Sequence, residues 1–248
     1  ALPSEVIAQL KRCRLISRLG NGTDKIDVDA ATKRGIIVSN SPYFCVAEMA
    51  DHIMAMLLAL TRRLPAMDLH MRTGAYSQAH NEGVLLQRLA GKTLGIIGFG
   101  APGPAVARRA APFGFKILAT RKNMAAPVDP DLEVEMVDLD TLLAQSDFVS
   151  LQLPLTPETR HLIDEAALAK MKPGAYLINT SRGALVDEYG LAHALATDHL
   201  AGAGIDTFED INIFAPDPEP PQGPLLNVKN AILTPHVAGL SVQASEDA

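Results

Sequence analysis

Apolar runs of strand length alternate with amphipathic stretches of helical period from Thr93 almost to the end of the chain. Strands that are buried on both faces read as continuous apolar runs, and right-handed helical crossovers join such strands when they lie parallel. The alternation therefore predicts an α/β fold built on a doubly wound parallel sheet. Its expected strands are residues 93–99, 115–120, 148–153, 175–180, 202–206 and 231–235.

The first forty residues predict a second, smaller α/β lobe. A helix capped by Ser4 precedes a strand at 13–19, and a short helix closed by Gly35 precedes a strand at 36–40. A polar cap residue and a terminal glycine are typical helix boundaries. Because no strand precedes the first helix in this sequence, we expect the smaller lobe to be truncated.

The segment between the two lobes is expected to be mostly helical. Residues 46–63 are apolar on nearly every side, which suits a central helix that is packed over most of its surface. Leu64 and Pro65 interrupt this pattern, and a further helical stretch is expected to end at Gly74. Residues 75–88 are polar and lack a period, so they are expected to form a connecting loop.

Composition narrows the range of partners. The 248 residues are 48% hydrophobic and 4% aromatic, and their formal net charge is -6. Neither a nucleic acid nor a membrane is expected to bind such a surface, which leaves a small molecule. The two cysteines, Cys13 and Cys45, indicate neither a disulfide framework nor a metal site, so a cytoplasmic setting is expected. The longest apolar run, 53–60, is too short to span a bilayer.

Gly98, Gly100 and Gly103 follow an apolar strand and precede a helical pattern, with Ala101 and Pro102 between them. This G-x-G-x-x-G spacing predicts the dinucleotide-binding loop of a Rossmann-type sheet, where the pyrophosphate lies at the amino end of the helix. Pro102 suits the first helical turn but has no N–H to donate. We therefore expect the pyrophosphate to be held by fewer direct bonds, and an ordinary glycine-rich turn is the alternative.

The residues after the second predicted strand of the sheet, Arg121 and Lys122, bear on the type of cofactor. Folds that bind NAD usually place an acidic residue there, which accepts from the ribose hydroxyls. Two cations suit a 2′-phosphate instead, because Arg121 can form charge-assisted bonds to it. The expected cofactor is therefore NADP, with NAD still open. The alternative is that both side chains form a solvated loop tip.

Several motifs, in order along the chain, resemble one known family. They are GKTLGIIGFG at 91–100, NTSRGALVDE at 179–188, TPH at 234–236, VAE at 46–48 and LPLT at 153–156. Over essentially its whole length, the chain resembles the D-isomer-specific 2-hydroxyacid dehydrogenases. This resemblance implies a two-lobed enzyme with a nicotinamide cofactor on the larger lobe and a 2-oxo or 2-hydroxy acid between the lobes. It also implies a homodimer formed through the cofactor lobe.

The same resemblance implies the domain limits. A partial substrate-binding lobe is expected at 1–44, a dinucleotide-binding domain at 45–236, and the start of a return to the substrate lobe at 237–248. The family's opening strands and closing helix are expected to lie outside this sequence.

By this resemblance, Arg182 binds the substrate and His236 is the acid and base. A guanidinium can hold a carboxylate and a carbonyl oxygen together, and an imidazole exchanges protons near neutral pH. Asn21 and Gly22 correspond to a loop whose amides meet the substrate carboxylate, although a plain turn is the alternative. His52 is expected to be packed within the apolar helix. The other residues expected around the cofactor are Leu153, Pro154, Thr180, Ser181, Asp206 and Gly239.

The chain departs from the family pattern at the acid that pairs with the catalytic histidine. The family reads Asp-Val-Phe-Glu-x-Glu-Pro, whereas this chain has Ile211 in place of the second glutamate. Three alternatives are open: the acid is lost, Glu209 or Asp210 replaces it, or Glu219 of the proline-rich loop at 215–224 folds back to the histidine. We favour Glu219 as the catalytic acid, because it precedes a proline as the family's acid does.

The leading hypothesis is an NAD(P)-dependent oxidoreductase that moves a hydride between the cofactor and a small 2-oxo or 2-hydroxy acid, similar to glyoxylate and hydroxypyruvate reductases. One alternative is a dinucleotide-sensing binding protein that resembles the C-terminal binding protein corepressors, which have the same fold. Another is the oxidation of a different small anion, such as phosphite. Turnover of 2-oxo acids separates the first hypothesis from the other two.

Overall fold

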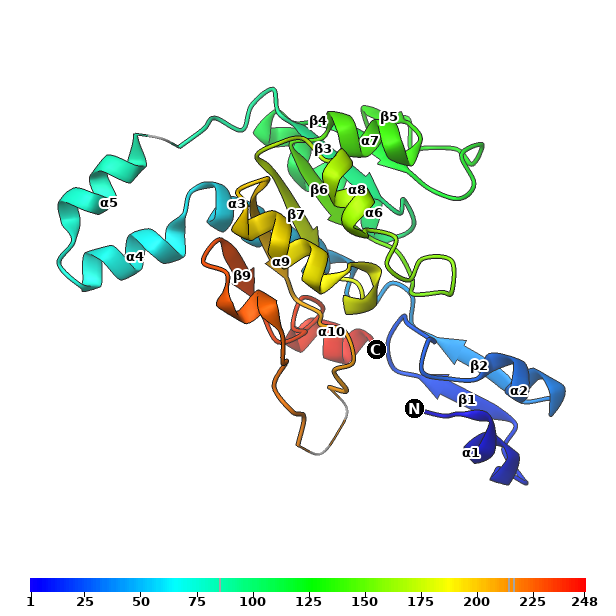
Figure 1. The fold of residues 1–248 in the computed structure, drawn as a ribbon. Coiled ribbons are helices and arrows are strands. Elements are labelled where there is room, and N and C mark those ends of the chain that lie inside the picture. The colour runs from blue at the N-terminus through cyan, green and yellow to red at the C-terminus, as the bar shows by residue number, and fades with distance from the viewer. Residues whose placement is uncertain (85, 214, 216) are drawn as a thin grey trace.

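The computed structural model describes residues 1–84, 86–213, 215 and 217–248. Within them, seven parallel strands form one sheet in the order β5-β4-β3-β6-β7-β8-β9 (Figure 1). The chain winds outward from β3 in both directions, because β4 and β5 lie on one side of it and β6 to β9 on the other. The predicted doubly wound, Rossmann-type parallel sheet is confirmed.

The central strands of this sheet are buried on both faces. Alternate residues of β3 belong to different cores: Ile96 packs with one layer of helices and Ile97 with the other. This is the period of two that a strand imposes on its side chains. The bounds are β3 (Thr93–Ile97), β4 (Lys116–Thr120), β5 (Val134–Met136), β6 (Phe148–Leu151), β7 (Ala175–Asn179), β8 (Leu200–Ile205) and β9 (Ala231–Leu233).

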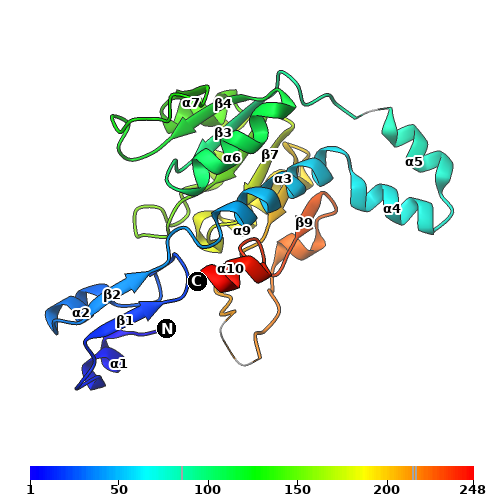
Figure 2. The same cartoon turned by 180° about the vertical axis from the view of Figure 1, so that it is seen from behind.

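Two layers of helices cover the sheet. The side chains of Ile53, Leu57 and Val106 lie in the core formed with α3 and α6, which Figure 2 shows from behind. Leu142 and Leu191 lie in the core on the opposite face. The bounds are α3 (Val46–Thr61), α6 (Pro102–Ala110), α7 (Leu139–Gln145), α8 (Glu165–Lys170) and α9 (Glu188–Ala196).

The first forty residues form a small lobe with its own core. Two parallel strands pair from Leu15↔Ile37 to Arg18↔Asn40, and Ile7 and Ala31 of the helices are buried in one core with Ile16 of the first strand. The predicted elements are confirmed, but Ser4 lies inside the first helix and Pro3 takes the capping position. The bounds are α1 (Ser4–Gln9), β1 (Leu15–Arg18), α2 (Val28–Lys33) and β2 (Ile37–Asn40).

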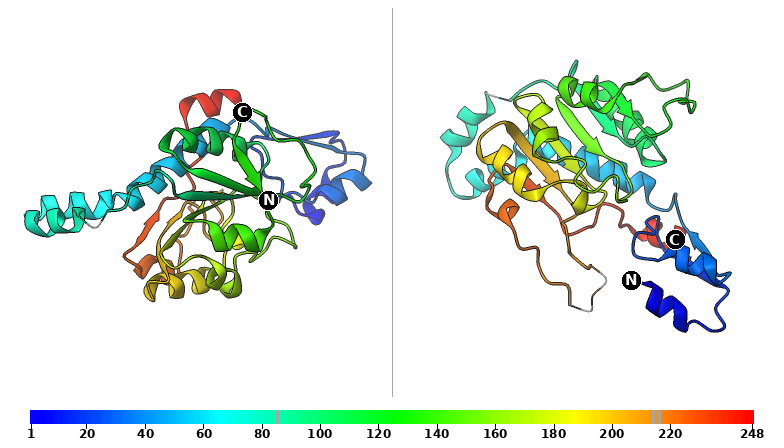
Figure 3. Two further views of the ribbon diagram at one scale, coloured as in Figure 1. Left: turned by 90° about the horizontal axis from the view of Figure 1, so that it is seen from above. Right: turned by 45° about the vertical axis from the view of Figure 1, so that its right-hand side comes forward.

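A helical arm leaves the body of the molecule after α3. It contains α4 (Leu64–Arg72) and α5 (Tyr76–Gly83), and it extends away from the side on which the small lobe lies (Figure 3). The prediction that residues 75–88 form a connecting loop was wrong, because α5 occupies much of that segment. Its polar sequence lacks a core-facing stripe for a physical reason: the helix packs on little besides α4.

Two further elements were not predicted. The short edge strand β5 pairs only with β4, and its three residues are too few to produce a recognisable apolar run. The helix α10 (Val242–Asp247) begins at Ser241, whose hydroxyl accepts from the amide of Ala244. In the described part of the chain, no helix has the length and apolar character needed to cross a membrane.

Candidate active site at the carboxyl edge of the sheet

The carboxyl ends of five neighbouring strands lie side by side. Ile97, Leu151, Asn179, Ile205 and Leu233 are in register from β3 to β9. The residues that follow these strands therefore form one row along the sheet edge. Ligands of doubly wound sheets bind outside this edge, next to the point where the strand order reverses, which here is beside β3.

Polar atoms without partners are buried along this row. Gln152 Oε1, Thr180 Oγ1 and Thr207 Oγ1 are inaccessible and accept or donate no hydrogen bond within the described residues. Each such atom costs about 1–3 kcal/mol when it stays unpaired. Their position at the ends of β6, β7 and β8 fits a polar ligand that completes their bonding.

The glycine loop leaves room for an anion at the start of α6. Gly98 has a φ of 94°, and a Cβ there would overlap the carbonyl oxygen of Gln152. In contrast, a Cβ at Gly100 would have no atom within 4 Å. The open space at Gly100 adjoins the amino end of a helix, where free amides and the helix dipole favour a pyrophosphate. These residues therefore fit a dinucleotide.

The two prolines of this loop fall within the first turn of α6. Pro102 is its first residue and Ala101 occupies the capping position. The first amides of a helix have no acceptor within the helix, so neither Pro102 nor Pro104 removes an internal bond. The predicted tolerance of the helix for Pro102 is confirmed. The reduced number of amides that face a pyrophosphate remains a prediction.

Arg121 follows β4 and ties two loops together. Its guanidinium donates to the carbonyl oxygens of Phe99 at 3.5 Å, Pro127 at 3.3 Å and Ala126. Its Nε is buried without a partner among the described residues. Arg121 is therefore a half-buried link between the glycine loop and the segment after β4, whereas Lys122 is exposed.

Arg182 stands just beyond β7. Asn179 fixes the turn by accepting from the amide of Ser181 at 3.1 Å and donating to the carbonyl of Arg182 at 2.8 Å. The guanidinium donates from Nε and Nη2 to Asp24 Oδ1, at 3.1 and 2.9 Å. Asp24 belongs to the small lobe, so this contact joins the two lobes at the site.

His236 lies on a loop that Asp206 holds in place. The histidine has a φ of 58°, a left-handed conformation unusual for a residue with a side chain. Its amide donates to the carbonyl of Asp206 at 2.7 Å. The buried Asp206 carboxylate accepts from Thr234 Oγ1 at 2.5 Å and from the amides of Val237 and Ala238 at 2.9 and 3.0 Å. Asp206, expected beside the nicotinamide, thus positions the loop that carries His236.

Arg182 and His236 line one cavity of about 150 Å³, and Gly22 and Asp24 line it from the small lobe. Burial lowers the pKa of His236 below its usual value, and the positive charge of Arg182 lowers it further. The carboxylates of Asp206 and Asp24 raise this pKa, but they offset the other effects only in part. The two side chains expected to catalyse therefore converge on one space.

The structure does not place Glu219 beside His236. Glu219 is exposed and is absent from the described residues that line the cavity. Glu209 and Asp210 both line the cavity, but the Glu209 carboxylate pairs with Arg160 and lies 2.8 Å from His161 Nε2. Ile211 lines the cavity at the place where the sequence pattern expects an acid.

The remaining expected residues have mainly structural contacts. Ser181 Oγ donates to the carbonyl of Leu151 at 2.7 Å, and the carbonyl of Pro154 accepts from Thr159 at 2.8 Å. Asn21 accepts at its carbonyl from Asn40 Nδ2 at 2.7 Å. A Cβ at Gly239 would lie 3.0 Å from the sulfur of Cys45, and one at Gly98 would lie 2.9 Å from Leu153.

Two residues of the site were missed by the motif search. Asp24 follows the glycine loop but was not singled out, since a lone aspartate in a turn carries no distinctive signal. His52 was expected to pack within α3, yet its Nε2 lies 3.1 Å from Thr234 Oγ1 and 3.8 Å from Asp206 Oδ1. The alternation of polar and apolar positions in α3 does not reveal which polar residue faces the sheet edge.

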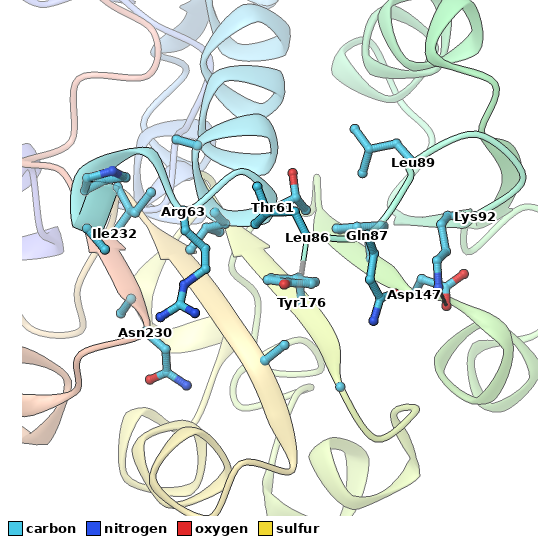
Figure 4. Close-up of a pocket in the computed structure, with 18 of the residues that line it drawn as sticks. Thr61, Arg63, Leu86, Gln87, Leu89, Lys92, Asp147, Tyr176, Asn230 and Ile232 are labelled. Carbon is cyan, nitrogen blue, oxygen red and sulfur yellow. Dashed lines mark ion pairs between the residues drawn. The ribbon is translucent and has the colours of Figure 1, made fainter. Parts of the chain in front are cut away.

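A larger cavity, of about 490 Å³, lies at the opposite edge of the sheet. Figure 4 shows Arg63 and Tyr176 on one side of it and Lys92 and Asp147 on the other. Lys92 precedes β3 and Asp147 precedes β6, so this space adjoins the amino ends of the strands. It is remote from Arg182, and it is not the candidate active site.

The sequence matches the family model described as "D-isomer specific 2-hydroxyacid dehydrogenase, NAD binding domain" over residues 54–238. The chain belongs to this family. A glyoxylate reductase of Thermococcus litoralis is 40% identical over 98% of this chain and 72% of its own length. The D-lactate dehydrogenase of Aquifex aeolicus, solved with NAD and lactic acid, superposes with a TM-score of 0.88 and 33% identity over 99% of this chain and 76% of that one.

The D-3-phosphoglycerate dehydrogenase of Mycobacterium tuberculosis is 38% identical over 99% of this chain. The match spans 44% of the length of that relative. The family assignment confirms the sequence resemblance, and it identifies the large sheet as a nicotinamide dinucleotide-binding domain. Within the described residues, no cluster of His, Cys, Asp and Glu could hold a metal ion.

Proposed function

We propose that this protein is an NAD(P)-dependent oxidoreductase that interconverts a small 2-oxo acid and the corresponding D-2-hydroxy acid. The observation that carries the proposal is the convergence of Arg182 and His236 on one cavity beside the dinucleotide edge of the sheet. Glyoxylate or hydroxypyruvate is the proposed substrate type. The volume of about 150 Å³ supports a substrate with few heavy atoms.

In the proposed reaction, the chain's own residues bind the acid and move its proton. Arg182 binds the substrate carboxylate and carbonyl oxygen through charge-assisted bonds, which fixes the reacting carbon. The bound nicotinamide supplies or accepts the hydride. Protonated His236 gives a proton to the carbonyl oxygen during reduction, and neutral His236 takes it back during oxidation. The amides around Gly22 provide further donors for the carboxylate.

We further propose NADP as the preferred cofactor. Arg121 and Lys122 support this proposal, because they follow β4 where a carboxylate would otherwise meet the ribose hydroxyls. The bonds from Arg121 to three carbonyl groups hold its guanidinium beside the glycine loop. Exposed Lys122 can reach a phosphate without breaking any of them.

Steady-state kinetics with a panel of anions tests the proposed activity. Glyoxylate, hydroxypyruvate, pyruvate and phosphite are each offered with the reduced or oxidised form of both cofactors. We expect turnover of the 2-oxo acids and a higher kcat/KM with NADPH than with NADH. Phosphite oxidation alone, or the absence of any turnover, would contradict the proposal. A preference for NADH would refute the cofactor assignment and leave the reaction class intact.

We also propose that the protein is a cytoplasmic homodimer. The arm supports the dimer, because Leu69, Met71 and Tyr76 are 59%, 54% and 63% exposed on it and apolar surface of this kind commonly marks an interface. Cys13 and Cys45 are free thiols, which supports a reducing compartment.

A further inference from the structure

The guanidinium of Arg182 is held on two sides by the protein itself. One side faces the small lobe, where Nε and Nη2 both donate to Asp24 Oδ1. On the other side Nη1 donates to the carbonyl of Ser181 at 2.7 Å. An arginine side chain has five N–H donors, so these bonds leave one donor on Nη1 and one on Nη2 for a ligand.

The side chain of Asp24 is largely buried against the protein. Its side chain retains 15% of its surface and that of Arg182 retains 29%. Burial alone would raise the pKa of Asp24, but the hydrogen bonds and charge of Arg182 outweigh burial and lower it, so Asp24 is ionised at neutral pH. A Cβ at Gly22 would overlap Arg182 Nη2 and lie 2.7 Å from Asp24 Oδ1. The loop backbone therefore packs directly on the ion pair.

We propose that Asp24 is a positioning residue for the substrate arginine: it grips the Nε side of Arg182 from the small lobe so that the two remaining Nη donors face the 2-oxo acid. This inference rests on the proposed function of Arg182 as the carboxylate ligand. It assigns a role in the reaction to a small-lobe residue that does not itself touch substrate.

The same contact admits an opposite interpretation, which the experiment must exclude. A carboxylate on the guanidinium could compete with the substrate carboxylate for the same donors. In that case removal of Asp24 would tighten substrate binding. A positioning role requires the reverse, because a released guanidinium must be ordered again by each substrate molecule.

The test compares Asp24→Asn and Asp24→Ala with the wild-type protein. Asparagine keeps an oxygen that can accept from Nε, whereas alanine keeps none. We expect KM for the 2-oxo acid to rise about tenfold in Asp24→Asn and about 100-fold in Asp24→Ala, with a lower kcat in both and an unchanged dissociation constant for the dinucleotide. A fall in KM, or equal kinetics in all three proteins, would overturn the proposal.

Asp27→Ala is the matched control for general damage to the small lobe. The Asp27 side chain caps α2 by accepting from the amide of Ala30 at 2.8 Å and makes no contact with Arg182 among the described residues. This variant should lower the melting temperature without a change in KM. If Asp27→Ala raises KM as much as Asp24→Ala does, the effect belongs to lobe stability and the positioning role is refuted.

A measurement without turnover separates this inference from the proposed function. The titration of His236 is followed by NMR in the protein free of substrate. Four charged groups act on His236: Asp206 and Asp24 raise its pKa, and Arg182 and Arg18 lower it. Asp24→Asn should therefore lower the pKa of His236 and speed the exchange of the Arg182 Nε proton. If both signals are unchanged, Asp24 does not position Arg182, whatever reaction the protein catalyses.

Discussion

Two aspartates hold the two expected catalytic side chains in place. Asp206 fixes the loop of His236 through the amides of Val237 and Ala238, and Asp24 holds the guanidinium of Arg182. Each contact restricts the position and orientation of the side chain that it holds. A reaction between groups held in the protein requires such fixed positions.

The pH dependence of reduction is a direct consequence of the cavity around His236. Its pKa is below the usual value of 6.5, mainly because it is buried. Reduction needs the protonated form, so kcat/KM for a 2-oxo acid should decline as pH rises through a value below 6.5. Oxidation of the hydroxy acid should rise through the same value. A decline of kcat/KM for reduction at a pH above 6.5 would show that a carboxylate pairs with His236 in solution.

Ile211→Glu tests the missing acid. This position lines the same cavity as His236. A carboxylate there should favour the imidazolium, so that kcat/KM for reduction falls at a pH about one unit higher. Ile211→Gln is the control, because it adds a polar side chain of the same length without charge. The pH profile of kcat/KM is the measurement. An equal shift in both variants would mean that charge at residue 211 does not govern His236.

The convergence of Arg182 and His236 on one cavity could be predicted from sequence, but the position of Glu219 could not. Arg182 and His236 occur in motifs long enough to be distinctive, and each follows an apolar strand that ends at the ligand edge. Glu219 was chosen because a proline follows it and because it precedes residues 223–226 as the family's acid does, but the structure leaves it exposed. The conformation of a proline-rich loop depends on tertiary contacts, which a local pattern does not contain.

At the scale of single elements, the glycine loop and the start of α6 give a prediction about dinucleotide affinity. Pro102 removes one amide from the first turn of α6, where the pyrophosphate is expected. Pro102→Ala restores that donor, so dinucleotide affinity should rise about fivefold, the value of one modest hydrogen bond. Fluorescence titration with the reduced cofactor measures this change. Pro104→Ala serves as a comparison, and equal gains in both variants would point to helix stability instead of the restored donor.

Elements with a strong hydrophobic period were predicted well, and exposed or very short ones were not. The helix expected over residues 46–63 is observed as α3, which presents a stripe of buried apolar residues to the sheet. In α5, Ala79 is the buried residue, so its sequence retains no such stripe. Strand β5 has an edge position and partial burial, which leaves no continuous apolar run to detect.

At the scale of the whole molecule, the arm and the two lobes determine the expected assembly. Leu69 and Met71 of the arm are exposed to solvent. The arm lies far from the small lobe (Figures 1 and 3). A second copy that covers the arm would bury these side chains without obstructing the cavity at the carboxyl edge of the sheet. The predicted limits of the domains at residues 44 and 236 await a direct test by limited proteolysis.

Leu69→Asp combined with Met71→Asp tests the dimer. Each substitution places a charge on exposed apolar surface of α4, so the fold should be retained while association is weakened by about 2 kcal/mol or more. Light scattering coupled to gel filtration measures the molar mass. The wild-type protein should behave as a dimer and the variant as a monomer. A wild-type monomer would contradict the proposal, and Asp68→Asn is a charge-removing control on the same helix.

The most direct test of the central claim is a crystal structure with the dinucleotide and oxamate, a non-reacting isostere of a 2-oxo acid. We expect the oxamate carboxylate on the Nη donors of Arg182, its carbonyl oxygen within hydrogen-bond distance of both Arg182 and His236, and the nicotinamide ring against its second carbon. Oxamate bound away from either side chain, or a nicotinamide placed outside the cavity that Arg182 and His236 share, would contradict the account.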